Sequence, residues 1–134
     1  MTRTNIAITF ASFALLATAG CSKGPEGGAP GAGPAKAAAA IPQEAKDVFA
    51  QRCVVCHGAS GKGDGVGAAA LNPKPRNYTD KQWQKTVTDD VLKKIIVGGG
   101  PAAGKSPLMP PNPDLSQKPA VIDGLVAIVR QFGQ

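Results

Sequence analysis

The chain has 134 residues and a formal net charge of +6, which leaves room for one small domain. Aromatic residues make up only 4% of it, so few large side chains are available for a core, and small domains are marginally stable. The positive charge is spread along the chain without a nucleic-acid-binding motif, which argues against a nucleic-acid partner and favours an acidic protein.

Residues 1–21 have the layout of an export signal rather than of a folded segment. A positive start, an apolar run over residues 6–17 and small residues precede Cys21. The run is shorter than the roughly 20 residues that a membrane-spanning helix needs. Ala19, Gly20 and Cys21 resemble the lipobox of bacterial lipoproteins, although Thr18 stands where leucine is usual. We therefore expect a lipid anchor on Cys21, the alternative being cleavage nearby without a lipid.

Residues 22–40 are mostly Gly, Pro and Ala without apolar periodicity, which predicts a flexible tether. The folded domain is then expected over residues 41–134. Pro42 suits the first turn of a helix, and a helix from there delivers the chain into Cys53. The residues on one side of that helix are Ala45, Val48, Phe49 and Arg52.

Cys53, Cys56 and His57 form a C-x-x-C-H pattern, which is typical of c-type haem attachment. Each thiol adds to one vinyl group of the haem, and the short spacing holds both sulfurs along one edge of the ring. His57 then lies under the iron as its proximal ligand. We therefore expect one covalent haem c, which also supplies the stabilising constraint that the small core lacks.

Other interpretations of this region fit less well. A structural zinc site needs about four ligands, whereas the chain has three cysteines and one histidine, and Cys21 lies in the leader. A redox dithiol or disulfide stays open, although a thioredoxin-like pair wants a βαβ setting. The glycines of residues 58–67 predict a loop that passes close over something flat, and no strand or clean GxGxxG there indicates a nucleotide site.

Two short helices are predicted after this loop. Thr79 and Gln82 form a capping box, with Tyr78 and Trp83 as its hydrophobic staple. A second helix begins at Thr88. The three glycines at residues 98–100 end it.

The C-terminal helix has a long apolar face. Ser116 or Asp114 can cap its N-terminus, and Pro119 is tolerated in its first turn. The apolar face consists of Val121, Ile122, Leu125, Val126, Ile128, Val129 and Phe132. Since no strand pattern is present, we predict an all-α domain of about four helices joined by Gly- and Pro-rich loops.

Met109 lies in the middle of the proline-rich stretch 105–113. It is the only methionine besides Met1, which makes it the available side chain for the second axial position, where a thioether raises the reduction potential. The alternative is a methionine that fills a gap in the core. A P-loop pattern overlaps at residues 99–106, but the prolines after it forbid the helix that a P-loop requires.

Over residues 41–134 the chain resembles the class I cytochrome c family. The resemblance rests on Phe49 four positions before Cys53, on the attachment motif, and on Met109 in a Pro-rich loop ahead of the C-terminal helix. It implies a monomeric monohaem carrier in which the first and last helices cross, so that Phe49 meets the last helix.

The segment 71–78 is similar to one found in many bacterial members of that family. By analogy, the carbonyl of Pro73, or else that of Pro75, accepts the ring N–H of His57 and raises its basicity. The resemblance also implies contacts to the haem propionates from Arg76 and from Trp83 or Tyr78. The ordinary alternatives are a solvated arginine and core aromatic residues.

The expected function is one-electron transfer between redox partner proteins, and not an enzymatic reaction, because two axial ligands leave no open site on the iron. If Met109 is not bound, a five-coordinate haem would instead indicate a gas sensor or a peroxidase-like enzyme. Since c-type haem is attached outside the cytoplasm, we expect a periplasmic or cell-envelope location, with a lipid anchor on the membrane.

Overall fold

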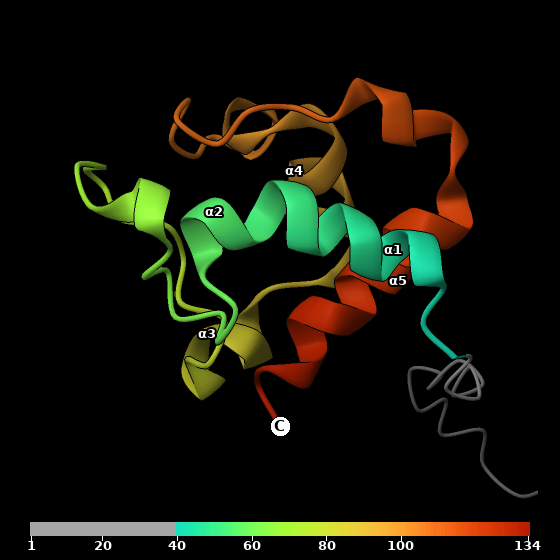
Figure 1. The fold of residues 1–134 in the computed structure, drawn as a ribbon, viewed down its shortest axis with the longest axis horizontal. Helices are drawn as coiled ribbons and strands as arrows, with labels where there is room; N and C mark the ends of the chain where they lie inside the picture. Colours follow the sequence, from blue (N-terminus) through green and yellow to red (C-terminus); the bar gives the residue numbers. More distant parts are fainter. Residues whose placement is uncertain (1–39) are drawn as a thin grey trace, which may run out of the picture. The chain divides into compact units, whose positions relative to one another are not determined.

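The attachment motif lies on one continuous helical segment, shown in Figure 1. The computed structural model describes residues 40–134, so the predicted leader, nearly all of the tether and Cys21 lie outside the described residues. The segment comprises α1 (Gln43–Val48), a π-helical turn (Phe49–Cys53) and α2 (Val54–His57). Helical backbone therefore continues past Cys53, where we expected the helix to deliver the chain, and ends at Gly58 with φ of 75°.

The next two helices are α3 (Lys81–Thr86) and α4 (Asp89–Gly98). The cap of α3 is Asp80 and not Thr79, because Asp80 Oδ1 accepts from the Gln82 and Trp83 N–H groups. Thr79 instead donates its backbone N–H and its hydroxyl to the Asn77 side chain. Thr88 caps α4 as predicted, since its Oγ accepts from the Val91 N–H. The predicted glycine stop is also confirmed: Gly99 follows α4 with φ of 73°.

The C-terminal helix is α5 (Pro119–Gln131), with Pro119 in its first turn. Neither Ser116 nor Asp114 caps it, because both lie in a 3₁₀ turn (Pro113–Gln117) that precedes the helix, and Lys118 takes the cap position without a side-chain bond. Two shorter 3₁₀ turns span Val66–Ala68 and Gly100–Ala103. Every residue of the predicted apolar face is buried except Phe132, which is half-buried.

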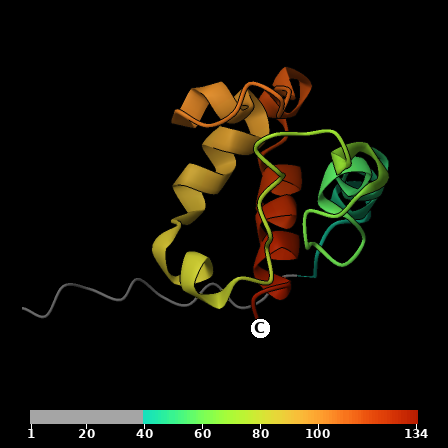
Figure 2. The ribbon, with the colours of Figure 1, turned by 90° about the vertical axis from the view of Figure 1, so that its left-hand side faces the viewer.

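Figure 2 shows α5 between α4 on one side and the α1–α2 segment on the other. The helices α1 and α5 approach closely at Ala45 and Gly124, where a Cβ on Gly124 would lie 2.7 Å from the Ala45 Cβ. Phe49 meets Phe132, with ring centroids 5.8 Å apart, as the resemblance implied.

The predicted all-α fold is confirmed, since residues 40–134 contain helices and loops and no strand. Among these residues, no helix combines the length and apolarity that a membrane span requires.

Candidate functional site

His57 is the last residue of α2, and its side chain is buried, with 7% of its surface exposed. Its Nδ1 lies 3.2 Å from the backbone oxygen of Arg76. Because a carbonyl can only accept, Nδ1 carries the hydrogen and the lone pair of the neutral ring is on Nε2. Burial lowers the pKa of His57, while the hydrogen bond to Arg76 opposes that shift. The buried imidazole is therefore a neutral base, which is the form that ligates iron.

The carbonyl that meets His57 is that of Arg76, and not that of Pro73 or Pro75 as the resemblance implied. The loop after His57 explains the difference. Gly63 donates its N–H to the His57 carbonyl at 2.8 Å, and its α-carbon faces the Pro75 carbonyl so closely that a Cβ there would overlap it. The Pro75 oxygen thus points to the glycine loop, while the next carbonyl in the chain reaches the imidazole.

The side chain of Arg76 is half-exposed. Its Nη1 is 3.2 Å from Asp80 Oδ2, and its guanidinium lies 5.3 Å from the centre of the Trp83 ring. The structure thus brings together two residues for which propionate contacts were predicted. Arg76 is here engaged by a carboxylate and an aromatic face, and the propionate contacts stay predictions.

Tyr78 is the site residue whose role sequence reasoning missed. Its buried ring stacks on His57, with centroids 4.4 Å apart and an angle of 13° between the planes. It also stacks on Trp83, the partner predicted for it, and on Phe132. Burial raises the pKa of the phenol well above its usual value, so the ring is neutral. The aromatic residue two positions after Arg76 was the available signal, but the contact depends on how the loop folds back.

Cys53 and Cys56 are free thiols, and burial raises the pKa of Cys53 to about 11. Cys53 lines an apolar cavity that also contains Tyr78 and Met109. The other residues around it are Val48, Phe49, Ile96, Asn112, Leu115, Leu125 and Val129. The volume of this cavity is only about 30 Å³. A haem attached here would therefore replace contacts between these side chains rather than fill a preformed void.

The donor set fits a c-type haem. Two free thiols one helical turn apart, a neutral imidazole beside the second, and a thioether on the cavity shared with the first are the groups that such a haem requires. Within residues 40–134, no three His, Cys, Asp or Glu side chains gather into a group that could hold a metal ion.

The loop that carries Met109 is fixed to the end of α4 through its backbone. Gly100 donates its N–H to the Met109 carbonyl at 3.0 Å. Asn112 donates its N–H to Val97 O and its side-chain amide to Ile96 O, both at 2.8 Å. The P-loop-like residues 99–106 follow a helix and form turns, so they lack the strand and the helix that a P-loop needs.

A sequence comparison identifies the family to which the chain belongs. The model of the family described as Cytochrome c matches residues 42–131, and the chain therefore belongs to the cytochrome c family. Neither the curated proteins nor the solved structures gave a match. Family membership implies one covalently attached c-type haem, and haem-based electron transfer is the general function that it supports.

Proposed function

We propose that this protein is a one-electron carrier whose haem is bound through Cys53 and Cys56 and ligated by His57 and Met109. The observation that carries the proposal is the shared apolar cavity, which Cys53 and Met109 both line. The neutral, buried imidazole of His57 lies at the end of the same helical segment as Cys53. When bound, the haem supplies an iron that cycles between the ferric and ferrous states.

The residues of the chain set the properties of that iron. The Arg76 carbonyl accepts from Nδ1 of His57, which fixes the ring and raises the basicity of Nε2. Met109 contributes a soft thioether, which favours the ferrous state and raises the reduction potential. The mostly apolar lining of the cavity would keep water away from the iron, which acts in the same direction.

The partners in this proposal are redox proteins, and the formal charge of +6 supports an acidic one. Attraction between opposite charges would speed association and would weaken as salt is added. A rate of electron exchange with acidic partners that is independent of ionic strength would contradict this part of the proposal.

Location outside the cytoplasm, with a lipid on Cys21, completes the proposal. It rests on the leader-like residues 1–21 and on the general occurrence of cytochrome c domains as extracytoplasmic or soluble proteins. Mass spectrometry of the mature N-terminus tests it. A chain cleaved elsewhere and carrying no lipid would remove the anchor while leaving the carrier unaffected.

The visible spectrum of the oxidised, haem-loaded full-length chain tests the axial pair. We expect the weak long-wavelength band of methionine bound to ferric iron, and we expect Met109→Ala to abolish it while the haem stays attached. Leu108→Ala is the matched control, since this neighbouring side chain is 47% exposed and does not line the cavity. A wild-type protein that lacks the band and readily binds carbon monoxide when reduced would contradict the proposal and favour the five-coordinate sensor or peroxidase-like alternative.

A further inference from the structure

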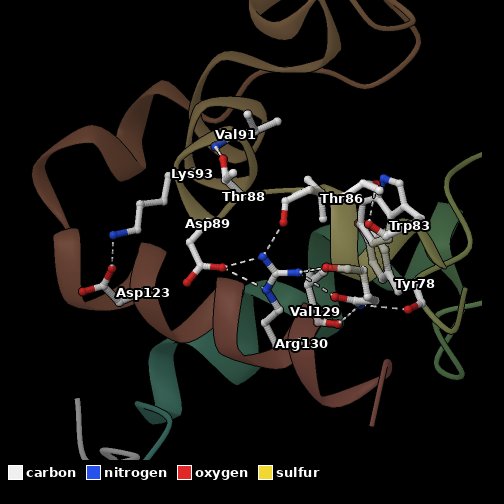
Figure 3. Close-up of polar contacts among 12 residues, drawn as sticks. Tyr78, Trp83, Thr86, Thr88, Asp89, Val91, Lys93, Asp123, Val129 and Arg130 are labelled. Atoms are coloured by element: carbon white, nitrogen blue, oxygen red, sulfur yellow. Dashed lines mark hydrogen bonds and ion pairs between the residues drawn. The ribbon is translucent and has the colours of Figure 1, made fainter. Parts of the chain in front are cut away.

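Arg130, near the end of α5, uses all five of its N–H groups within the protein (Figure 3). Nε and Nη2 both donate to Asp89 Oδ1, at 2.8 and 2.7 Å. Nη2 also donates to the Val87 carbonyl, and Nη1 donates to both the backbone and the side-chain oxygen of Gln84. A guanidinium saturated in this way has one available orientation, so it fixes the groups around it.

Gln84, in α3, passes this constraint on towards the site. Its side-chain oxygen accepts from Arg130, so its nitrogen must face the other way. That nitrogen donates to the carbonyls of Val129 and Tyr78, both at 2.8 Å. The carboxamide thereby connects α5 to the residue whose ring stacks on His57.

Tyr78 is therefore held at both backbone polar groups. Its N–H donates to the Gly61 carbonyl at 2.7 Å, and its carbonyl accepts from Gln84. With the backbone fixed on both sides, the ring has little freedom to leave the face of His57, where the planes are only 13° from parallel. The Arg76 carbonyl fixes His57 through its edge, and Tyr78 fixes it through its face.

We propose that Gln84 and Arg130 are positioning residues for the iron ligand His57, and that they act by holding Tyr78 against the imidazole. This inference rests on the proposed axial role of His57. When the pair is broken, Tyr78 can shift off the face of the imidazole, so the ring plane of His57 would no longer be fixed and water would gain access beside it. Water stabilises the ferric state, so the reduction potential falls.

Paramagnetic NMR and voltammetry of the haem-loaded full-length chain test the proposal. The spread of the hyperfine-shifted haem methyl resonances reports the plane of the axial imidazole. Gln84→Met keeps the size and the neutrality of the side chain but removes the amide that bonds to Tyr78, Val129 and Arg130. Arg130→Lys keeps the positive charge but removes the planar guanidinium with its five N–H donors. We expect both variants to change that spread and to lower the potential. Lys93→Gln is the matched control, because its ion pair with Asp123 also joins α4 to α5, and it should leave the methyl spread unchanged.

A merely structural role for the pair makes a different prediction. In that case Gln84→Met and Arg130→Lys lower the denaturation midpoint but leave the methyl resonances and the potential as in the wild type, which would overturn the proposal. Tyr78→Phe and Tyr78→Leu provide a second test should the first variants fold poorly. If the ring of residue 78 is held in place through its backbone, Tyr78→Phe should keep the wild-type methyl resonances and Tyr78→Leu should change them. Equal spectra for the two variants would also overturn the proposal.

The proposed function fails separately from this inference. If the wild-type protein lacks the spectrum of a histidine-ligated haem, the axial assignment itself is wrong. If that spectrum is present and the Gln84 and Arg130 variants leave it unmoved, only the positioning role is wrong.

Discussion

The two proposed iron ligands are held in opposite ways. His57 is buried, stacked on an aromatic ring and hydrogen-bonded through its own side chain. Met109 is half-buried, and what fixes it is its backbone, through the Gly100 N–H and the bonds of Asn112 to the end of α4.

Because of this difference, each ligand should be sensitive to a different kind of substitution. On the His57 side, substitutions of large side chains such as Tyr78 should matter, because side chains make the contacts. On the Met109 side, glycines matter, because a Cβ on Gly99 would lie 2.7 Å from the Met109 oxygen, and one on Gly100 would overlap Ser106 O. The His57 side depends on large side chains as well as on the close approach at Gly63, whereas the close approaches on the Met109 side are at Gly99 and Gly100.

The largest effect is expected when both attachment cysteines are replaced, because neither proposed ligand then has a covalently held haem beside it. Replacing Cys53 and Cys56 by serine should abolish covalent attachment completely, since serine hydroxyls do not replace the two thiols. The small apolar core should then be poorly stable, because little else compensates for the lost cofactor. Mass spectrometry and a pyridine haemochrome assay measure the loss. Val55→Ala, between the two cysteines and 45% exposed, should keep the haem. Equal haem content in the double variant and the wild type would contradict the attachment role.

A smaller effect, confined to the Met109 side of the site, is expected when Gly99 gains a side chain. Gly99→Ala places a β-carbon at φ of 73° and against the Met109 and Pro110–Pro111 backbone. We expect it to destabilise the domain by about 2–4 kcal/mol, the sum of a positive-φ backbone conformation that essentially only glycine adopts and an overpacked contact. The methionine band should weaken while the haem stays attached to the cysteines.

Gly104→Ala is the control for that experiment. Gly104 also has a positive φ, 65°, but with ψ of 29° it is in the αL region, whereas Gly99 has ψ of −178°. A Cβ on Gly104 would meet nothing within 4 Å. The backbone strain alone should cost about 1–2 kcal/mol and leave the methionine band intact. Denaturant titration and the visible spectrum of both variants measure the difference. Equal destabilisation by the two substitutions would show that the close approach at Gly99 contributes nothing.

The same contrast explains what could be predicted from the sequence. The C-x-x-C-H spacing, the Thr88 cap, the glycine stop after α4 and the apolar face of α5 are local patterns, and each is visible in a few neighbouring residues. The all-α fold followed from them.

The errors share one cause, which is the path of the loops. Asp80, and not Thr79, caps α3 because the loop turns at Asn77, which accepts from Thr79, and leaves Asp80 facing the first free N–H groups of the helix. The carbonyl beside His57 is three residues later than Pro73. The stack of Tyr78 on His57 likewise depends on how residues 58–63 fold against residues 75–78. Such contacts join distant positions through backbone geometry, and propensity or periodicity does not encode them.

The smallest effect concerns the link between the two sides. Arg52, which precedes Cys53, donates to Asp114 Oδ1 at 2.9 Å and to Asn112 Oδ1 at 3.3 Å, so it joins the attachment helix to the end of the Met109 loop. The hydrogen bond from Arg52 lowers the pKa of Asp114. A carboxylate whose pKa is lower in the folded state stabilises the fold above its unfolded pKa, about 3.9, and loses that contribution as the pH falls through the folded value.

We therefore expect Arg52→Gln to destabilise the domain slightly at pH 7, as is usual for an exposed ion pair, with a difference from the wild type that shrinks below about pH 4. The bond to Asn112 does not titrate, so a difference that persists in acid measures that bond together with any hydrogen bond that Arg52 keeps to the protonated Asp114 carboxyl. Denaturation midpoints across pH, with Asp114→Asn as the variant that removes only the titrating partner, separate the two parts. A difference that is flat with pH, or that grows in acid, would show that the Asp114 carboxylate contributes nothing to holding the two sides together.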